Sequence, residues 1–125
     1  MPFVTSNGLT EEATSRSIQA GGTTIHYHDI GEGEPLLFLH TYGPGSTGWL
    51  TFHKVIGAIS QRYRCIVMDL ANAGGTGPVV YNEPVHSVHA RMAEALLDSL
   101  GIDQVTLIGN SVGGTTSLVF NTATP

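Results

Sequence analysis

The chain has 125 residues, a length typical of one small domain. Hydrophobic residues make up 41% and charged residues 12% of the sequence, a balance that predicts a globular chain and excludes a disordered one. Five Lys and Arg against ten Asp and Glu give a net charge of −5, and no basic run occurs, so the composition argues against nucleic-acid binding.

The cysteine content and the N-terminal sequence together predict the cellular compartment of the protein. The one cysteine, Cys65, cannot form an internal disulfide, which fits a reducing compartment, and its apolar neighbours predict a buried core thiol. Residues 1–15 lack the charged and apolar regions of a signal peptide. No stretch approaches the roughly eighteen apolar residues of a membrane span. We therefore expect a cytoplasmic protein without a membrane segment.

The N-terminal part predicts a lead-in followed by two strands. Residues 1–16 are rich in small polar residues and are expected to form a flexible lead-in to a domain that spans 17–125. Two segments with strand character, 17–20 and 23–30, are separated by a pair of glycines. This pattern predicts a strand, a turn and a second strand.

Buried strands alternate with amphipathic helices in the remainder of the chain. Continuous apolar runs predict strands over 35–39, 64–70 and 105–108. Apolar residues at helical spacing predict helices over 47–61, 85–100 and 112–120. This alternation predicts an α/β fold, with a mostly parallel sheet and helices on both faces.

A serine-centred glycine motif follows the last predicted strand. Residues 108–114 read Ile-Gly-Asn-Ser-Val-Gly-Gly, and the strand before them and the helix after them are the context of a G-x-S-x-G nucleophile elbow. Gly109 and Gly113 allow the sharp turn, and Ser111 at its apex is the candidate nucleophile. The alternative is an ordinary strand–helix turn with a serine N-cap. The flanking elements and Gly114 favour the elbow.

The partners that such a serine needs are not in this sequence. A serine nucleophile requires a base and an acid that orients the base, and in this type of fold both follow the serine in chain order. No His, Asp or Glu occurs after Ser111 in these 125 residues. We therefore expect the chain to be a fragment whose acid and base lie outside it, with no significant turnover on its own.

A second glycine loop leaves the predicted strand 35–39. Residues 40–46 read His-Thr-Tyr-Gly-Pro-Gly-Ser and follow the carboxyl end of that strand, where α/β sheets place their sites. A lone glycine loop can be a simple turn. Beside a nucleophile elbow it is also a natural source of the second oxyanion-binding N–H group.

These motifs together resemble those of the meta-cleavage-product hydrolases, which are α/β-hydrolases that cleave carbon–carbon bonds in bacterial aromatic-ring degradation. The resemblance covers residues 17–125. It rests on a shared set of residues: His40-x-x-Gly43-Pro44-Gly45, Trp49, Phe52, Asp69, Leu100-Gly101-Ile102-Asp103 and Gly109-Asn110-Ser111-x-Gly113-Gly114-x-Thr116.

The resemblance implies a serine hydrolase that cleaves 2-hydroxy-6-oxo-dienoates after ketonisation of the dienol, without a metal or organic cofactor. It implies that Ser111 is the nucleophile and that the backbone N–H groups of Val112 and Tyr42 form the oxyanion hole. The residues implied to bind substrate are Asn110, Thr41 and Gly43. Those implied to support the site are His40, Gly109, Gly113 and Gly114.

The resemblance also implies a small-molecule substrate, a helical cap in the missing C-terminal part and a homo-oligomeric full-length protein. A carboxylesterase of the same fold is the alternative among enzymes. A non-catalytic binding protein that keeps the scaffold is the alternative from another class. Dehalogenases and epoxide hydrolases place Asp at the elbow apex, where this chain has Ser111.

Six histidines suggest a metal site as a further hypothesis. His26 and His28 share one face of a predicted strand, and His86 and His89 lie three apart on a predicted helix. Because neither pair has an apparent carboxylate or cysteine partner, we expect no metal and hydrogen-bonded or solvated rings. We expect Asp69 to cap a helix or bind a turn, because Asp commonly does so at strand ends.

Overall fold

The computed structural model describes residues 5, 8–40, 46–80 and 83–109. The predicted helix over 112–120 lies outside the described residues. So do eight of the predicted site residues: Thr41, Tyr42, Gly43, Asn110, Ser111, Val112, Gly113 and Gly114.

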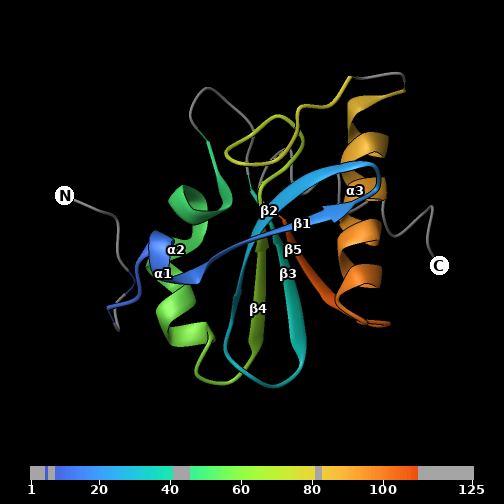
Figure 1. Cartoon of the computed structure of the whole chain (residues 1–125). Coiled ribbons are helices and arrows are strands. Elements are labelled where there is room, and N and C mark those ends of the chain that lie inside the picture. The colour runs from blue at the N-terminus through green and yellow to red at the C-terminus, as the bar shows by residue number, and fades with distance from the viewer. Residues whose placement is uncertain (1–4, 6–7, 41–45, 81–82, 110–125) are drawn as a thin grey trace.

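The described strands form one five-stranded sheet in the order β1-β2-β4-β3-β5 (Figure 1). Their bounds are β1 Ser15–Ala20, β2 Thr23–Ile30, β3 Pro35–Leu39, β4 Arg64–Met68 and β5 Thr106–Gly109. β2 pairs antiparallel with both β1 and β4, whereas β3 pairs parallel with both β4 and β5. The predicted α/β fold is confirmed, and the N-terminal hairpin makes the described sheet mixed.

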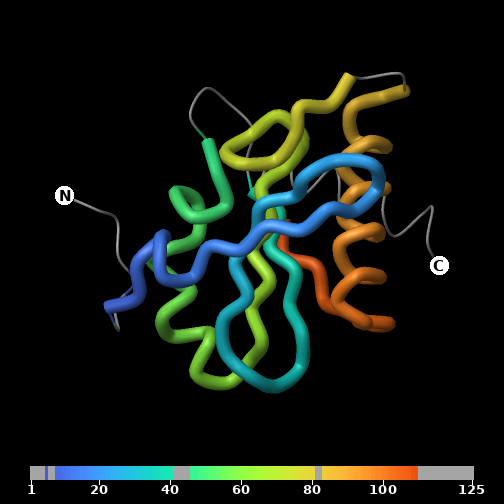
Figure 2. Tube along the Cα trace, in the orientation of Figure 1, coloured from blue at the N-terminus to red at the C-terminus, as the bar shows by residue number. Residues whose placement is uncertain are grey.

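Helices lie on both faces of this sheet, as the sequence predicts. Helix α2 (Gly48–Ile59) covers one face and α3 (Val85–Ser99) the other, on opposite sides in Figure 1. A short helix, α1 (Glu11–Thr14), precedes β1. The tube in Figure 2 shows the turn between β1 and β2 reaching α3, where Gly21 lies against Ala95.

Strand β3 supplies side chains to both hydrophobic cores. Successive residues of a strand point to opposite faces, so Leu37 and Leu39 join the core under α3, and Leu36 and Phe38 join the core under α2. Both cores need apolar residues at every position of this strand, which explains the continuous apolar run over 35–39.

Several element boundaries differ from the predicted ones. Strand β1 begins at Ser15 rather than at residue 17, because Ser15 already pairs in register with His28 of β2. The predicted lead-in 1–16 therefore contains α1 and the start of a strand. The remaining observed bounds, Arg64–Met68, Thr106–Gly109, Gly48–Ile59 and Val85–Ser99, replace the predicted 64–70, 105–108, 47–61 and 85–100.

Strand β4 ends two residues early for a specific reason. The backbone N–H of Asp69 still donates to the carbonyl of His26 on β2, at 3.0 Å. The next two N–H groups, of Leu70 and Ala71, donate to histidine side chains instead of to a neighbouring strand. The chain is thus still buried and hydrogen-bonded beyond Met68 but is no longer part of the sheet.

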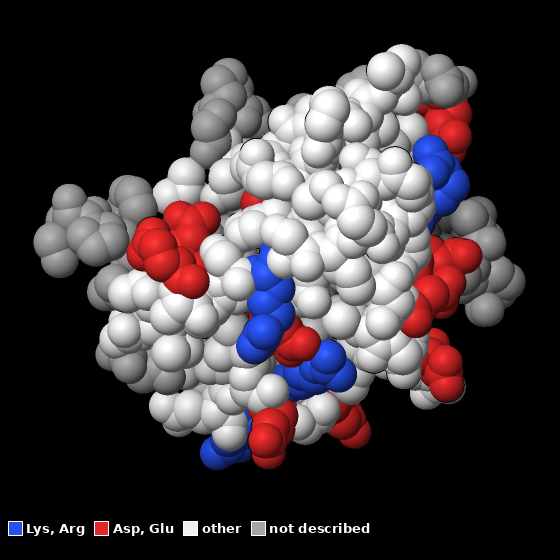
Figure 3. All heavy atoms as spheres, in the orientation of Figure 1, with Lys and Arg blue, Asp and Glu red and all other residues white. Residues whose placement is uncertain are grey.

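The burial of the one cysteine and the distribution of charged side chains on the surface agree with what the composition predicts. Cys65 on β4 is fully buried, as predicted, and burial raises its pKa to about 11. On the face drawn in Figure 3, Lys and Arg side chains form small groups beside Asp and Glu and leave no broad basic area. No helix within the described ranges is long and apolar enough to cross a membrane.

Truncating Leu96 of α3 tests the packing of the larger core. Leu96 is 0% exposed, so Leu96→Ala should lower the free energy of unfolding by about 2–5 kcal/mol, through lost burial and a residual cavity. Leu50 on the outer face of α2 is 42% exposed, and Leu50→Ala should change it by less than about 1 kcal/mol. Urea unfolding of both variants measures the difference. Equal losses would contradict the assigned core.

Candidate functional site

The carboxyl ends of β3, β4 and β5 lie at one edge of the sheet. β3 and β5 are directly paired there, with Leu39 in register with Gly109. The predicted oxyanion loop follows Leu39 and the predicted elbow begins at Gly109. The two segments that contain the remaining predicted site residues therefore leave adjacent strands at the same level, as the site predicted from sequence requires.

His40 links the ends of two neighbouring strands. Its ring is fully buried directly after β3, and its Nε2 accepts a hydrogen bond from the backbone N–H of Leu70, at 2.9 Å. Because an N–H group can only donate, Nε2 carries no proton in this arrangement, and a neutral ring then has its proton on Nδ1. The lone pair that a general base would use is already engaged, so His40 has a structural contact and not the geometry of a triad base.

His89 of α3 binds the next residue of the same segment. Its Nδ1 accepts from the backbone N–H of Ala71 at 3.2 Å, and its ring is also fully buried. Burial, and then the neighbouring rings of His86 and His40, lower the pKa of His89 to about 4. A neutral ring at physiological pH is the form that can accept this hydrogen bond.

Asp69, which lies in the chain between β4 and Leu70, accepts contacts from three donors. Its Oδ1 accepts from the backbone N–H of Gly48, the first residue of α2, at 2.8 Å. Its Oδ2 accepts from the N–H of Gly75 at 3.2 Å and contacts Nδ1 of His26 at 2.7 Å. The prediction that Asp69 caps a helix or binds a turn is confirmed, since it does both.

The charges of Asp69 and His26 stabilise each other. Burial by itself raises the pKa of Asp69, but the hydrogen bonds from His26, Gly48 and Gly75 outweigh burial and hold that pKa below its usual value. The hydrogen bond to Asp69 raises the pKa of His26. The expectation that His26 lacks a carboxylate partner is therefore wrong. The partner is 43 residues away in sequence and is brought close by the antiparallel pairing of β2 with β4.

His28, the other histidine on this face of β2, is neutral, in contrast to His26. Its Nδ1 is hydrogen-bonded to Thr14 Oγ1 at 2.8 Å, and its ring packs against Trp49 with a centroid distance of 4.9 Å. Burial lowers the pKa of His28 to about 4. In the described part of the chain, no group of three or more His, Cys, Asp or Glu side chains is arranged to hold a metal ion.

Ser15, His26 and Asp69 have the spatial order of a catalytic triad, with Ser15 Oγ 3.0 Å from His26 Nε2. Sequence reasoning missed this cluster because Ser15 belonged to the predicted lead-in. However, Ser15 Oγ donates to the carbonyl of Glu11 at 2.8 Å, and that oxygen would repel an oxyanion formed beside the serine. The cluster therefore attaches α1 to the sheet.

A cavity of about 400 Å³ lies away from this edge. It is lined by residues at the amino ends of β3 and β5, namely Glu34, Pro35, Gln104, Val105 and Thr106. Catalytic sites of α/β sheets lie at the carboxyl ends of the strands, so this cavity is not the candidate substrate site.

Residues 34–120 match the family model described as alpha/beta hydrolase fold. The match covers more than half of the chain, and the strand order and helix placement agree with it. The chain therefore belongs to the α/β-hydrolase fold family.

Two hydrolases with named substrates are similar in sequence to this chain. The chain is 36% identical to 2-hydroxy-6-oxononadienedioate/2-hydroxy-6-oxononatrienedioate hydrolase 1 of Dechloromonas aromatica, over 97% of this chain and 44% of that protein. It is 41% identical to 2-hydroxy-6-oxo-6-phenylhexa-2,4-dienoate hydrolase of Comamonas testosteroni, over 77% of this chain and 34% of that protein. The chain thus spans less than half the length of these relatives.

Solved structures show the same fold. A variant of the meta-cleavage product hydrolase CumD from Pseudomonas fluorescens IP01, complexed with acetates, superposes with a TM-score of 0.83 at 28% identity, over 89% of this chain and 41% of that chain. The epoxide hydrolase CorEH superposes with a TM-score of 0.79 at 27% identity, over 86% of this chain and 36% of that chain.

The buried, neutral His89 predicts a loss of stability in acid. Its folded-state pKa of about 4 lies below the unfolded value near 6.5, so the unfolded chain binds more protons between these values. The free energy of unfolding should therefore fall as the pH falls from about 6.5 to about 4. His89→Gln, which keeps an acceptor for Ala71, should reduce that slope by up to about 1.4 kcal/mol per pH unit.

Ser99→Ala, at the exposed end of α3, is the control, because it changes no titratable group and should keep the wild-type slope. Denaturant unfolding at a series of pH values measures all three proteins. An unchanged slope in His89→Gln would show that His89 is not the neutral buried group inferred from its contacts.

Proposed function

We propose that this chain is part of a serine hydrolase that cleaves a carbon–carbon bond of 2-hydroxy-6-oxo-dienoates, the meta-cleavage products of aromatic-ring degradation. The main structural support is the register of Leu39 with Gly109, which starts the predicted oxyanion loop and the predicted elbow side by side. The named relatives, at 36% and 41% identity, support the substrate class.

In this proposal the substrate binds as its keto form between the two loops, in contact with Asn110, Thr41 and Gly43. Ser111 Oγ attacks the 6-carbonyl carbon and gives its proton to a base, while the N–H groups of Val112 and Tyr42 stabilise the oxyanion. The bond from C6 to the adjacent carbon breaks, and that carbon takes a proton. Water then hydrolyses the acyl-serine to release a carboxylic acid.

The contacts of the described histidines support a base outside these 125 residues. His40 Nε2 accepts from Leu70, and His89 Nδ1 accepts from Ala71. His26 is paired with the carboxylate of Asp69. Each of these rings already has a structural hydrogen bond, so the proposed base and its orienting acid belong to sequence that the chain does not include.

The other properties of the protein follow from the same proposal. Its substrate is a small molecule, and neither a metal nor an organic cofactor takes part. A cytoplasmic location is supported by the one buried thiol, Cys65. The epoxide hydrolase CorEH shares the fold, but Ser111 at the elbow apex favours acyl-enzyme chemistry over that of an Asp nucleophile.

The test uses the longest polypeptide that the gene's reading frame encodes. It should hydrolyse 2-hydroxy-6-oxo-6-phenylhexa-2,4-dienoate or the nonadienedioate, measured as loss of the dienolate absorbance. Ser111→Ala should lower kcat at least about a thousandfold, because the nucleophile is lost. Ser60→Ala, in the residue that follows α2 and lies far from the candidate edge, is the control and should leave kcat unchanged.

Two outcomes would contradict the proposal in different ways. Turnover of p-nitrophenyl esters far above dienoate cleavage would identify a carboxylesterase. Binding of dienoate without turnover, in a polypeptide that has no Asp and His downstream of Ser111, would identify a non-catalytic binding protein on the hydrolase scaffold.

A further inference from the structure

The two residues that flank the segment between β3 and α2, His40 and Gly48, are bound by two consecutive residues of the chain, Leu70 and Asp69. At its start, Nε2 of His40 accepts from the N–H of Leu70 at 2.9 Å. At its end, the N–H of Gly48 donates to Oδ1 of Asp69 at 2.8 Å. Residues 41–47, which include the predicted oxyanion donor, therefore start and finish at contacts with consecutive residues of the chain after β4.

The side chain of Asp69 is buried, and the residues that surround it fix its position. Its side chain is only 2% exposed, and it lies beside the N-terminus of α2, where a negative charge is favourable. Gly74 has a φ of +52°, and a side chain there would overlap Oδ2 of Asp69. The next residue, Gly75, donates its N–H to the same oxygen at 3.2 Å.

His26 completes the set of donors from the opposite side. It extends from β2, with Nδ1 2.7 Å from Oδ2 of Asp69 and Nε2 3.0 Å from Ser15 Oγ. The side chain of His26 is 15% exposed, so solvent can exchange its proton. It is the one side-chain donor to Asp69 among the described contacts, and the other donors there are backbone N–H groups that cannot titrate.

The groups around His26 favour its charged form. The carboxylates of Asp69 and Glu11 raise the pKa of His26, and the adjacent ring of His28 is neutral, because burial lowers its pKa to about 4. Burial, and then the charge of Asp69, raise the pKa of Glu11.

We propose that Asp69 and His26 are positioning residues, and that their ion pair holds Gly48 and so fixes the end of the predicted oxyanion loop next to α2. Deprotonation of His26 leaves Asp69 with its two backbone donors but without its cationic partner. Gly48 and the start of α2 are then held less firmly. The consequence for catalysis rests on the proposed function, whereas the consequence for the loop itself does not.

The direction of the pH effect follows from the raised pKa of His26. The stabilisation that protonated His26 gives the folded state is fully present below the unfolded-state pKa of His26. It is lost as the pH rises through the higher folded-state pKa of the same ring. The contact that holds Gly48 at the start of α2 should therefore weaken on the alkaline side. His28 and His89, whose folded-state pKa values are lowered, act in acid and have the opposite sign.

Hydrogen–deuterium exchange of the peptide covering 41–50, in the longest encoded polypeptide, tests the positioning directly. Asp69→Asn and His26→Gln should each speed exchange there by about tenfold, because a charge-assisted hydrogen bond is lost. In the wild type, exchange corrected for its intrinsic pH dependence should rise as the pH rises above the unfolded-state pKa of about 6.5 and through the higher folded-state pKa of His26. In His26→Gln, which keeps a donor but cannot titrate, this rise should disappear.

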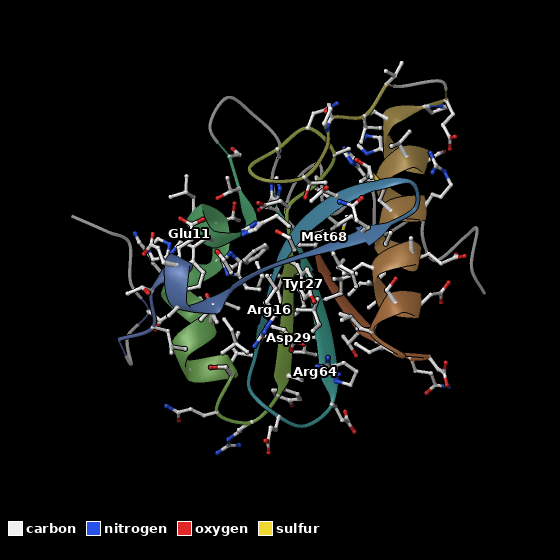
Figure 4. All side chains as sticks on the ribbon, viewed as in Figure 1. Glu11, Arg16, Tyr27, Asp29, Arg64 and Met68 are labelled. Atoms are coloured by element: carbon white, nitrogen blue, oxygen red, sulfur yellow. The ribbon has the colours of Figure 1, made fainter. Side chains whose placement is uncertain are left out.

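Asp29→Asn is the matched control. It breaks the bidentate pair of Asp29 with Arg64, at 3.0 and 2.7 Å, which joins the same two strands at the other end of β4 (Figure 4). It should leave exchange over 41–50 unchanged. If Asp69→Asn does not fold, His26→Gln decides, because its side chain reaches the surface. Wild-type exchange in both variants, or equal loosening in Asp29→Asn, would overturn the proposal.

Kinetics give a separate readout. In His26→Gln, kcat on a dienoate should fall about tenfold with little change in KM, and the alkaline decline of kcat that depends on His26 should vanish. If the wild type has no dienoate turnover at all, the proposed function fails, but the exchange measurement still decides whether Asp69 and His26 position the loop. Wild-type kcat and pH profile in His26→Gln would contradict the catalytic consequence.

Discussion

The candidate site depends on how the chain is held immediately after β4. Among the described strands, none pairs in register with this segment beyond Met68, although the N–H of Asp69 still bonds to β2. The segment is buried, so its other polar groups need partners from elsewhere. Histidine side chains provide them, from β2, from the end of β3 and from α3. The contacts are Asp69 with His26, Leu70 with His40 and Ala71 with His89.

The three histidine rings have different protonation states and roles because their surroundings differ. His40 and His89 accept backbone N–H groups in fully buried positions, which only a neutral imidazole can do. His26 faces two carboxylates near the surface and is stabilised as a cation. The same residue type thus supplies two acceptors and one charged donor to a single segment, with the local dielectric and neighbouring charge as the deciding factors.

Polar contacts and hydrophobic packing contribute at different levels. The two apolar cores bind α2 and α3 to the sheet and supply most of the stability expected for such a domain. They do not specify where the connecting segments lie. That is set by directional contacts, such as Gly48 with Asp69 at the start of α2, and it explains why the chain after β4 contacts both layers of the α/β-hydrolase fold.

The sequence by itself determined the type and order of the elements from β1 to β5, because apolar periodicity and glycine positions are local: the run 35–39 predicted a strand buried on both faces. It also nominated Ser111, His40 and the capping role of Asp69. It did not predict helix α1. Tertiary structure decided what depends on distant partners. The pairing of β2 with β4 gave His26 its carboxylate, and the pairing of β1 with β2 set the start of β1 at Ser15. The register of Leu39 with Gly109 put the ends of β3 and β5 side by side, where the two predicted site segments begin. Contacts across 43 residues leave no periodic signal in a sequence, since they arise only when strands pair.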